Sequence, residues 1–138
     1  MSLAPRVVLV YRRTELDELL AHHGTYGQAA FFLSSRGRQI EQVATRHHTQ
    51  AQTITAVTQA IPVDWRRGTV ERGDLSRFLF AEDDIIVAVG QDGLVANVAK
   101  YLNGQVVIGA KSMSLLPSKS RMKLLLAKLS NTTLVIQS

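Results

Sequence analysis

Three uninterrupted runs of apolar residues constrain the fold of this chain more than any other feature. They are Val7–Val10, Ile85–Val89 and Val106–Ile108, and most of their members are β-branched. A strand that is apolar at consecutive positions is covered on both faces, as in parallel sheets with helices on each side. The 138 residues have room for one such domain. We therefore expect an α/β fold, a three-layer sandwich with a mostly parallel, Rossmann-like sheet.

Helix signals occupy most of the sequence between these runs. Thr14, with Asp17 three residues later, is typical of the capping box that begins a helix. Pro62 ends a long stretch whose apolar residues recur on one helical face. The predicted helices cover residues 15–22, 26–35, 38–61 and 94–102, and a weaker strand is predicted over residues 64–71.

A glycine-containing turn separates the second apolar run from the last of these helices. It reads Gly90, Gln91, Asp92 and Gly93. Strand, turn, helix and strand make a βαβ unit, which is expected to cross over with a right hand. Ligands of open α/β sheets bind beyond the carboxyl ends of the strands, and glycines let a backbone approach them closely. Asp92 could accept a proton or hold a cation there, or it could only cap the helix.

The stretch Asp84–Leu94, with the following helix and the strand ending in Gly109, resembles the NAD kinase family. That family carries Gly-Gly-Asp-Gly-Thr after an apolar strand. The resemblance covers about residues 4–110 and implies that Asp92 is the base that activates the ribose 2′-hydroxyl of NAD. It also implies a cofactor-binding turn formed by Gly90, Gln91, Gly93 and Leu94.

The implied activity is the transfer of phosphate from ATP or polyphosphate to the 2′-hydroxyl of NAD, which makes NADP. ATP and NAD would be the substrates, and magnesium would accompany ATP. Three residues depart from the family pattern: Gln91 adds a side chain, Leu94 lacks the threonine hydroxyl, and Lys111 replaces an asparagine. The family's β-rich C-terminal domain has no counterpart after position 110. We therefore expect weak or no activity of this chain alone, and the alternative is a non-catalytic nucleotide-binding or assembly module.

The charge changes abruptly near position 110. Residues 1–110 hold 11 basic and 11 acidic groups, so the whole net charge of +5 lies in residues 111–138. These two ranges are the predicted organisation, a nucleotide-binding domain followed by a compositionally distinct basic tail. A shifted reading frame would produce such a change. Leucines in the tail predict a helix after Pro117 and a strand over residues 134–136.

Several other classes of site find little support. The chain has no cysteine, which excludes disulfides and thiolate chemistry. The adjacent pairs His22-His23 and His47-His48 point apart on a helix, so we expect no metal site from them. Arg12 and Arg13 follow the first strand, where they either meet a phosphate or lie in a solvated loop.

The expected partners are nucleotide substrates. No apolar run is long enough for a membrane helix or a signal peptide, so we expect a cytoplasmic protein without a membrane partner. Nucleic acid is the least favoured partner, and any binding to it would depend on the basic tail, because the basic excess is confined there. A homo-oligomer is left open.

Overall fold

A computed structural model describes residues 5–90, 93–110 and 135–136 of the chain. Its strands form one parallel sheet in the order β2-β1-β3-β4-β5, and β5 contributes only two residues at the edge. The elements in chain order are β1 (Arg6–Tyr11), α1 (Glu15–His23), α2 (Tyr26–Ser34), α3 (Ile40–Ala60), β2 (Arg66–Glu71), the 3₁₀ helix η1 (Arg72–Arg77), β3 (Ile85–Val89), α4 (Leu94–Ala99), β4 (Val106–Ala110) and β5 (Val135–Ile136).

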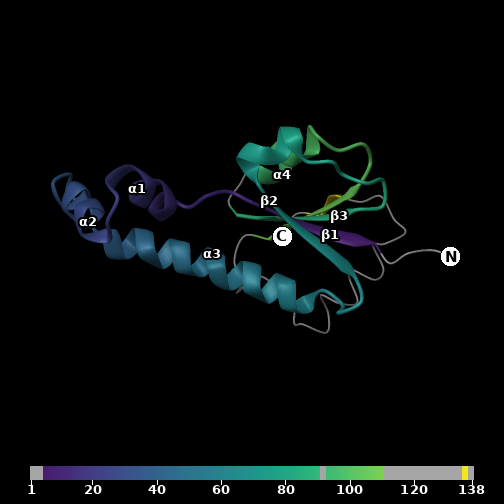
Figure 1. Cartoon of the computed structure of the whole chain (residues 1–138), viewed down its shortest axis with the longest axis horizontal. Coiled ribbons are helices and arrows are strands. Elements are labelled where there is room, and N and C mark those ends of the chain that lie inside the picture. The colour runs from purple at the N-terminus through teal and green to yellow at the C-terminus, as the bar shows by residue number, and fades with distance from the viewer. Residues whose placement is uncertain (1–4, 91–92, 111–134, 137–138) are drawn as a thin grey trace.

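The predicted fold class is confirmed: helices flank both faces of an all-parallel sheet (Figure 1). The capping box at Thr14 is present, and Gly24 is the C-cap of α1. The long helix α3 ends where Pro62 predicts. The last helix, α4, is three residues shorter than predicted. The predicted strand at residues 134–136 appears as β5, while the helix predicted after Pro117 lies outside the described residues.

Each face of the sheet has its own apolar core. Alternate residues of β1 and β3 face α3, where Val57, Ala60 and Ile61 cover them. The remaining residues of these strands face the other side, where η1, α4 and the Phe78–Phe80 loop cover them. The chain crosses the sheet in one direction from β1 to β2. It then crosses in the other direction, from β2 to β3 and on to β4. Crossovers of one hand then lie on opposite faces, as they do here.

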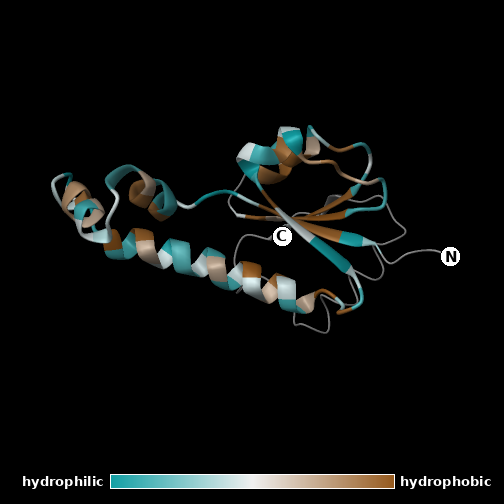
Figure 2. Cartoon of the chain, viewed as in Figure 1, coloured by the Kyte–Doolittle hydropathy of each residue, from teal (hydrophilic) through white to brown (hydrophobic). Residues whose placement is uncertain are grey.

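A third apolar cluster lies apart from the sheet. Leu16 of α1, Ala29 and Leu33 of α2, and Ile40 and Val43 of α3 form it. We call α1, α2 and residues 40–47 of α3 the helical arm. Figure 1 shows the arm projecting beyond the sheet, joined to it by the continuous helix α3. Figure 2 shows that the most hydrophobic ribbon is that of the central strands. Among the described residues, no helix has the length and apolar character needed to cross a bilayer.

The amino ends of β1 and β3 are joined by a buried ion pair. The Arg6 guanidinium donates from Nε to Asp84 Oδ1 at 3.1 Å and from Nη2 to Oδ2 at 2.6 Å. The backbone N–H of Ala81 also donates to Asp84 Oδ2 at 2.8 Å. The hydrogen bond to Asp84 raises the pKa of Arg6, so the guanidinium stays protonated. The Asp84 side chain is fully buried, and these donors supply the hydrogen bonds that water cannot.

We expect Asp84→Ala to lower the free energy of unfolding by about 3 kcal/mol, because it removes the carboxylate that pairs with Arg6 and the acceptor of the Ala81 N–H, and leaves Arg6 only the Leu79 carbonyl. Urea denaturation followed by circular dichroism measures the change. The matched control is Glu82→Ala, an exposed carboxylate nearby, which should shift stability by at most about 0.5 kcal/mol. Equal midpoints for the two variants would contradict the role given to Asp84.

Candidate functional site

The strand register brings three carboxyl ends to the same level. Tyr11 at the end of β1 is the partner of both Glu71 in β2 and Val89 in β3. The next residues of the three strands are Arg12, Arg72 and Gly90. The chain leaves β1 toward one edge of the sheet and β3 toward the other. Such a reversal opens a crevice between the two strand ends, which is where ligands of this strand order bind.

A cleft of about 850 Å³ lies at this edge, between the sheet and the helical arm. Its volume is within the range of small-molecule and cofactor sites. The lining combines apolar, amide and charged side chains. The described residues that line it are Arg12, Arg13, Thr14, Glu15, Glu18, Val43, Arg46, Thr49, Gln50, Glu71, Arg72, Gly73, Val89, Gly90, Leu94 and Asn97.

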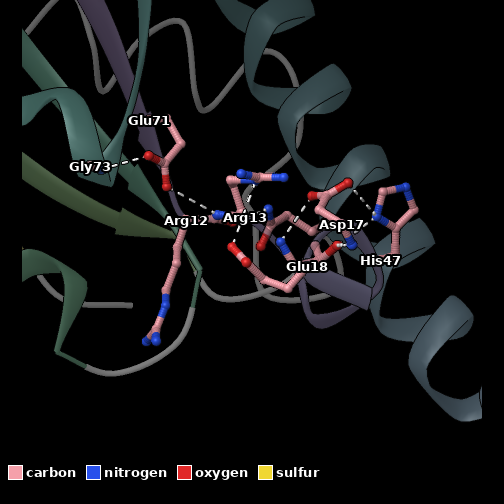
Figure 3. A network of polar contacts seen from close by, with 9 residues as sticks. Arg12, Arg13, Asp17, Glu18, His47, Glu71 and Gly73 are labelled. Atoms are coloured by element: carbon pink, nitrogen blue, oxygen red, sulfur yellow. Dashed lines mark hydrogen bonds and ion pairs between the residues drawn. The ribbon is translucent and has the colours of Figure 1, made fainter. Parts of the chain in front are cut away.

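The loop after β1 is held from both sides of the cleft. On one side, Gln50 of α3 donates from Nε2 to the backbone oxygen of Arg12 at 2.8 Å. On the other, Glu71 accepts from the backbone N–H of Arg13 at 3.4 Å and from that of Gly73 at 2.6 Å (Figure 3). The loop therefore has a defined path although its arginine side chains are exposed.

The first turn of α1 is connected to α3 by a polar network. The Thr14 hydroxyl accepts from the Asp17 N–H at 3.2 Å, and Asp17 Oδ2 accepts from the Thr14 N–H at 3.0 Å. The same hydroxyl lies 2.7 Å from His47 Nδ1, and Asp17 Oδ1 lies 3.7 Å from that nitrogen. Figure 3 shows this group beside the loop of Arg12 and Arg13. The network orients the arm wall of the cleft.

Glu15 lies between Arg38, in the connection from α2 to α3, and Arg46 of α3. Arg38 Nη1 is 2.6 Å from one carboxylate oxygen, and Arg46 Nη1 is 3.7 Å from the other. The hydrogen bond from Arg38, opposed by partial desolvation, lowers the pKa of Glu15. Glu15 therefore stays ionised at neutral pH and offsets positive charge on this wall.

On the sheet side of the cleft, two arginines are not paired with any described carboxylate. The side chains of Arg12 and Arg72 have no hydrogen-bond or ion-pair partner within the described ranges, and both are exposed. In Figure 3 the Arg12 side chain extends away from the Glu71 and Glu18 carboxylates. Arg13 contacts Glu18 only loosely, at 3.7 Å. Exposed guanidinium groups without acceptors are suited to bind a phosphate or carboxylate.

Only some of the predicted site residues line the cleft. Gly90 and Leu94 line the cleft, whereas Gly93 is the exposed N-cap of α4 and is not among its described lining. Gly90 has φ +147° and Gly93 has φ +95°, so both need glycine. Leu94 is buried in the core below Gly90. Gln91 and Asp92 lie outside the described residues.

The described carboxylates of the cleft do not fit a resident magnesium ion. Glu71 accepts two backbone N–H groups, and Glu15 and Glu18 face arginines. Across the described ranges, no three histidine, aspartate or glutamate side chains gather in a way that could hold a metal.

Several lining residues were not singled out from the sequence. Gln50, Thr49 and Arg46 come from the middle of α3, and Asn97 comes from α4. Their polarity matches the exposed face of an amphipathic helix, so the sequence holds no distinct signal for them. Arg72 does have a signal, because it directly follows a predicted strand.

Comparison with protein-family models, with curated proteins and with solved structures found no match for this chain. The chemistry of the cleft therefore carries the functional argument.

We expect Gly90→Ala to destabilise the fold by about 1–3 kcal/mol, because a side chain is strained at this positive φ. Gly68→Ala in β2 is the matched control, since its Cβ would meet only Phe78 at an ordinary 3.8 Å. The control should be neutral or slightly more stable. Chemical denaturation of both variants tests the difference, and a Gly90→Ala protein as stable as the parent would show that the turn tolerates a side chain.

Proposed function

We propose that this chain is a nucleotide-binding domain of the NAD-kinase-like type, whose cleft holds phosphate groups at the carboxyl ends of β1, β2 and β3. The observation that carries the proposal is the cleft of about 850 Å³ at the point where the strand order reverses, with Arg12, Arg72 and Gly90 at its sheet side. Gly90 presents backbone without a side chain, and the two arginines supply positive charge. Phosphate groups are the ligands that best use both.

The rest of the lining suits the other parts of a nucleotide. Val43, Val89 and Leu94 are the apolar residues of the lining, each at most 5% exposed, and Gln50 and Asn97 provide amides. Apolar contacts hold a ring in cofactor sites, and placed polar groups fix its orientation. ATP, NAD and NADP are accordingly the ligands to test.

For the reaction, we propose the role that the family resemblance gives to Asp92. Its carboxylate would take the proton of the ribose 2′-hydroxyl while that oxygen attacks the terminal phosphorus of ATP and ADP leaves.

One observation favours the non-catalytic alternative. Leu94 stands where the family has a threonine, and its side chain is 5% exposed and packed in the core. A hydroxyl is thus replaced by a core contact at the floor of the cleft. Such a replacement suits a domain that binds nucleotide with little or no phosphoryl transfer.

Arg12→Gln should weaken nucleotide binding at least tenfold without changing stability, because the Arg12 side chain has no partner among the described residues and its removal deletes a phosphate contact. Isothermal titration calorimetry with ATP, NAD and NADP measures the affinity. Arg77→Gln is the control, since this exposed arginine pairs with Asp74 and does not line the cleft. If neither the parent chain nor the control binds any of the three nucleotides, the proposed function is wrong.

A second test separates binding from catalysis. We expect Gln91→Gly with Leu94→Thr, which restores two family residues, to raise ATP-dependent formation of NADP above that of the parent chain. Adding Asp92→Asn to this variant should lower the rate by a factor of about 10² while binding remains. Enzymatic cycling assays detect small amounts of NADP. Nucleotide binding without any gain in NADP formation would favour the non-catalytic module.

A further inference from the structure

The carboxylate of Glu71 lies among the arginines to which the proposed function assigns phosphate. Glu71 is the last residue of β2, the strand that neighbours β1 at the edge of the sheet, and Arg72 follows it directly. Its register partner in β1 is Tyr11, which precedes Arg12. Glu71, Arg12 and Arg72 all line the cleft. A carboxylate at this place needs a reason, because it opposes the binding of an anion.

Two backbone N–H groups fix the orientation of this carboxylate. Glu71 Oε2 accepts from Gly73 at 2.6 Å and Oε1 accepts from Arg13 at 3.4 Å (Figure 3). The donors come from opposite sides, one from η1 and the other from the loop after β1. A carboxylate has about four acceptor positions, and these bonds use two of them. The other two can accept from a ligand while the carboxylate stays anchored.

The other two carboxylates in the described lining are held differently. Glu15 lies 2.6 Å from Arg38 and 3.7 Å from Arg46, so its charge is offset. The Glu18 side chain is 65% exposed and lies 3.7 Å from Arg13. Within the described lining, Glu71 is therefore the carboxylate that the backbone orients toward a ligand.

A sugar hydroxyl is the ligand group that best suits an oriented carboxylate beside phosphate-binding arginines. A hydroxyl donates a charge-assisted hydrogen bond to a carboxylate, whereas a second phosphate would be repelled by it. Ribose has two neighbouring hydroxyls and is joined to the phosphate of a nucleotide. In open α/β sheets that bind dinucleotides, an acidic side chain accepts the ribose 2′-hydroxyl.

From this geometry we infer that Glu71 accepts the ribose hydroxyls of the bound nucleotide and thereby selects ribonucleotides over 2′-deoxyribonucleotides. The inference rests on the proposed function, because it needs a nucleotide whose phosphates lie at Arg12 and Arg72. It adds the sugar to the description of the ligand. The role is separate from that proposed for Asp92, which acts on the hydroxyl that receives phosphate.

Isothermal titration calorimetry of the full chain with ATP and with 2′-deoxy-ATP tests the inference. The parent should bind ATP at least about tenfold more tightly, because the deoxynucleotide lacks a hydroxyl that donates to a carboxylate. Glu71→Thr should bring the ratio of the two dissociation constants close to one, mainly by weakening the binding of ATP. Threonine suits a strand, and its hydroxyl can still accept from a backbone N–H at the start of η1.

The ratio of two affinities measured on one protein is insensitive to a change in the folded fraction. Glu18→Thr is the matched control, because it removes the same charge from the lining at a carboxylate that faces Arg13 rather than backbone donors. It should change both affinities by the same factor and keep the ratio of the parent.

Two results would overturn the inference and leave the proposed function standing. One is a parent chain that binds ATP and 2′-deoxy-ATP equally, which requires no variant. The other is a Glu71→Thr protein that keeps the ratio of the parent. A parent chain that binds none of ATP, NAD and NADP would instead contradict the proposed function, and the inference would fall with it.

Discussion

The burial of β1 and β3 on both faces is the constraint on which the rest of the structure depends. Every residue of β3 is buried, and so are the four central residues of β1. Such strands cannot tolerate water on either side, so the chain must supply a layer to each face. It does so by leaving β1 and β3 in opposite directions, and that reversal opens the cleft between Arg12 and Gly90. The position of the candidate site is thus a by-product of covering the sheet.

Helix α3 serves two cores with one apolar stripe. Val57 and Ala60 near its end pack on the sheet, and Ile40 and Val43 near its start pack on the arm. Between them, Arg46, Thr49 and Gln50 face the cleft. The polar residues in the middle of the helix therefore line the candidate site, while both ends of the helix pack in apolar cores.

Local signals predicted the fold well, because apolar runs, the cap at Thr14 and the stop at Pro62 act through neighbouring residues. Of the residues singled out from the sequence as site residues, Gly90 and Leu94 line the cleft, while Arg12 had been left open between a phosphate contact and a solvated loop. The opposite wall could not be predicted, because Gln50 and Asn97 look like ordinary surface residues of amphipathic helices. The placement of Gln50 depends on how far α3 extends past the sheet, and that of Asn97 on how α4 packs over it, both of which tertiary packing decides. The pairing of Arg6 with Asp84 was missed for the same reason, since 78 positions separate them.

Because α3 is a continuous helix of 21 residues, it behaves as a lever with its short end in the sheet core. Val57 and Arg46 are about 16 Å apart along its axis, so a tilt of about 5° at Val57 would displace Arg46 by roughly 1.4 Å. A displacement of that size matters to a site that positions a ligand. Substitutions where α3 packs on the sheet, such as at Val57 or Ala60, would then change the width of the cleft without altering the residues that line it.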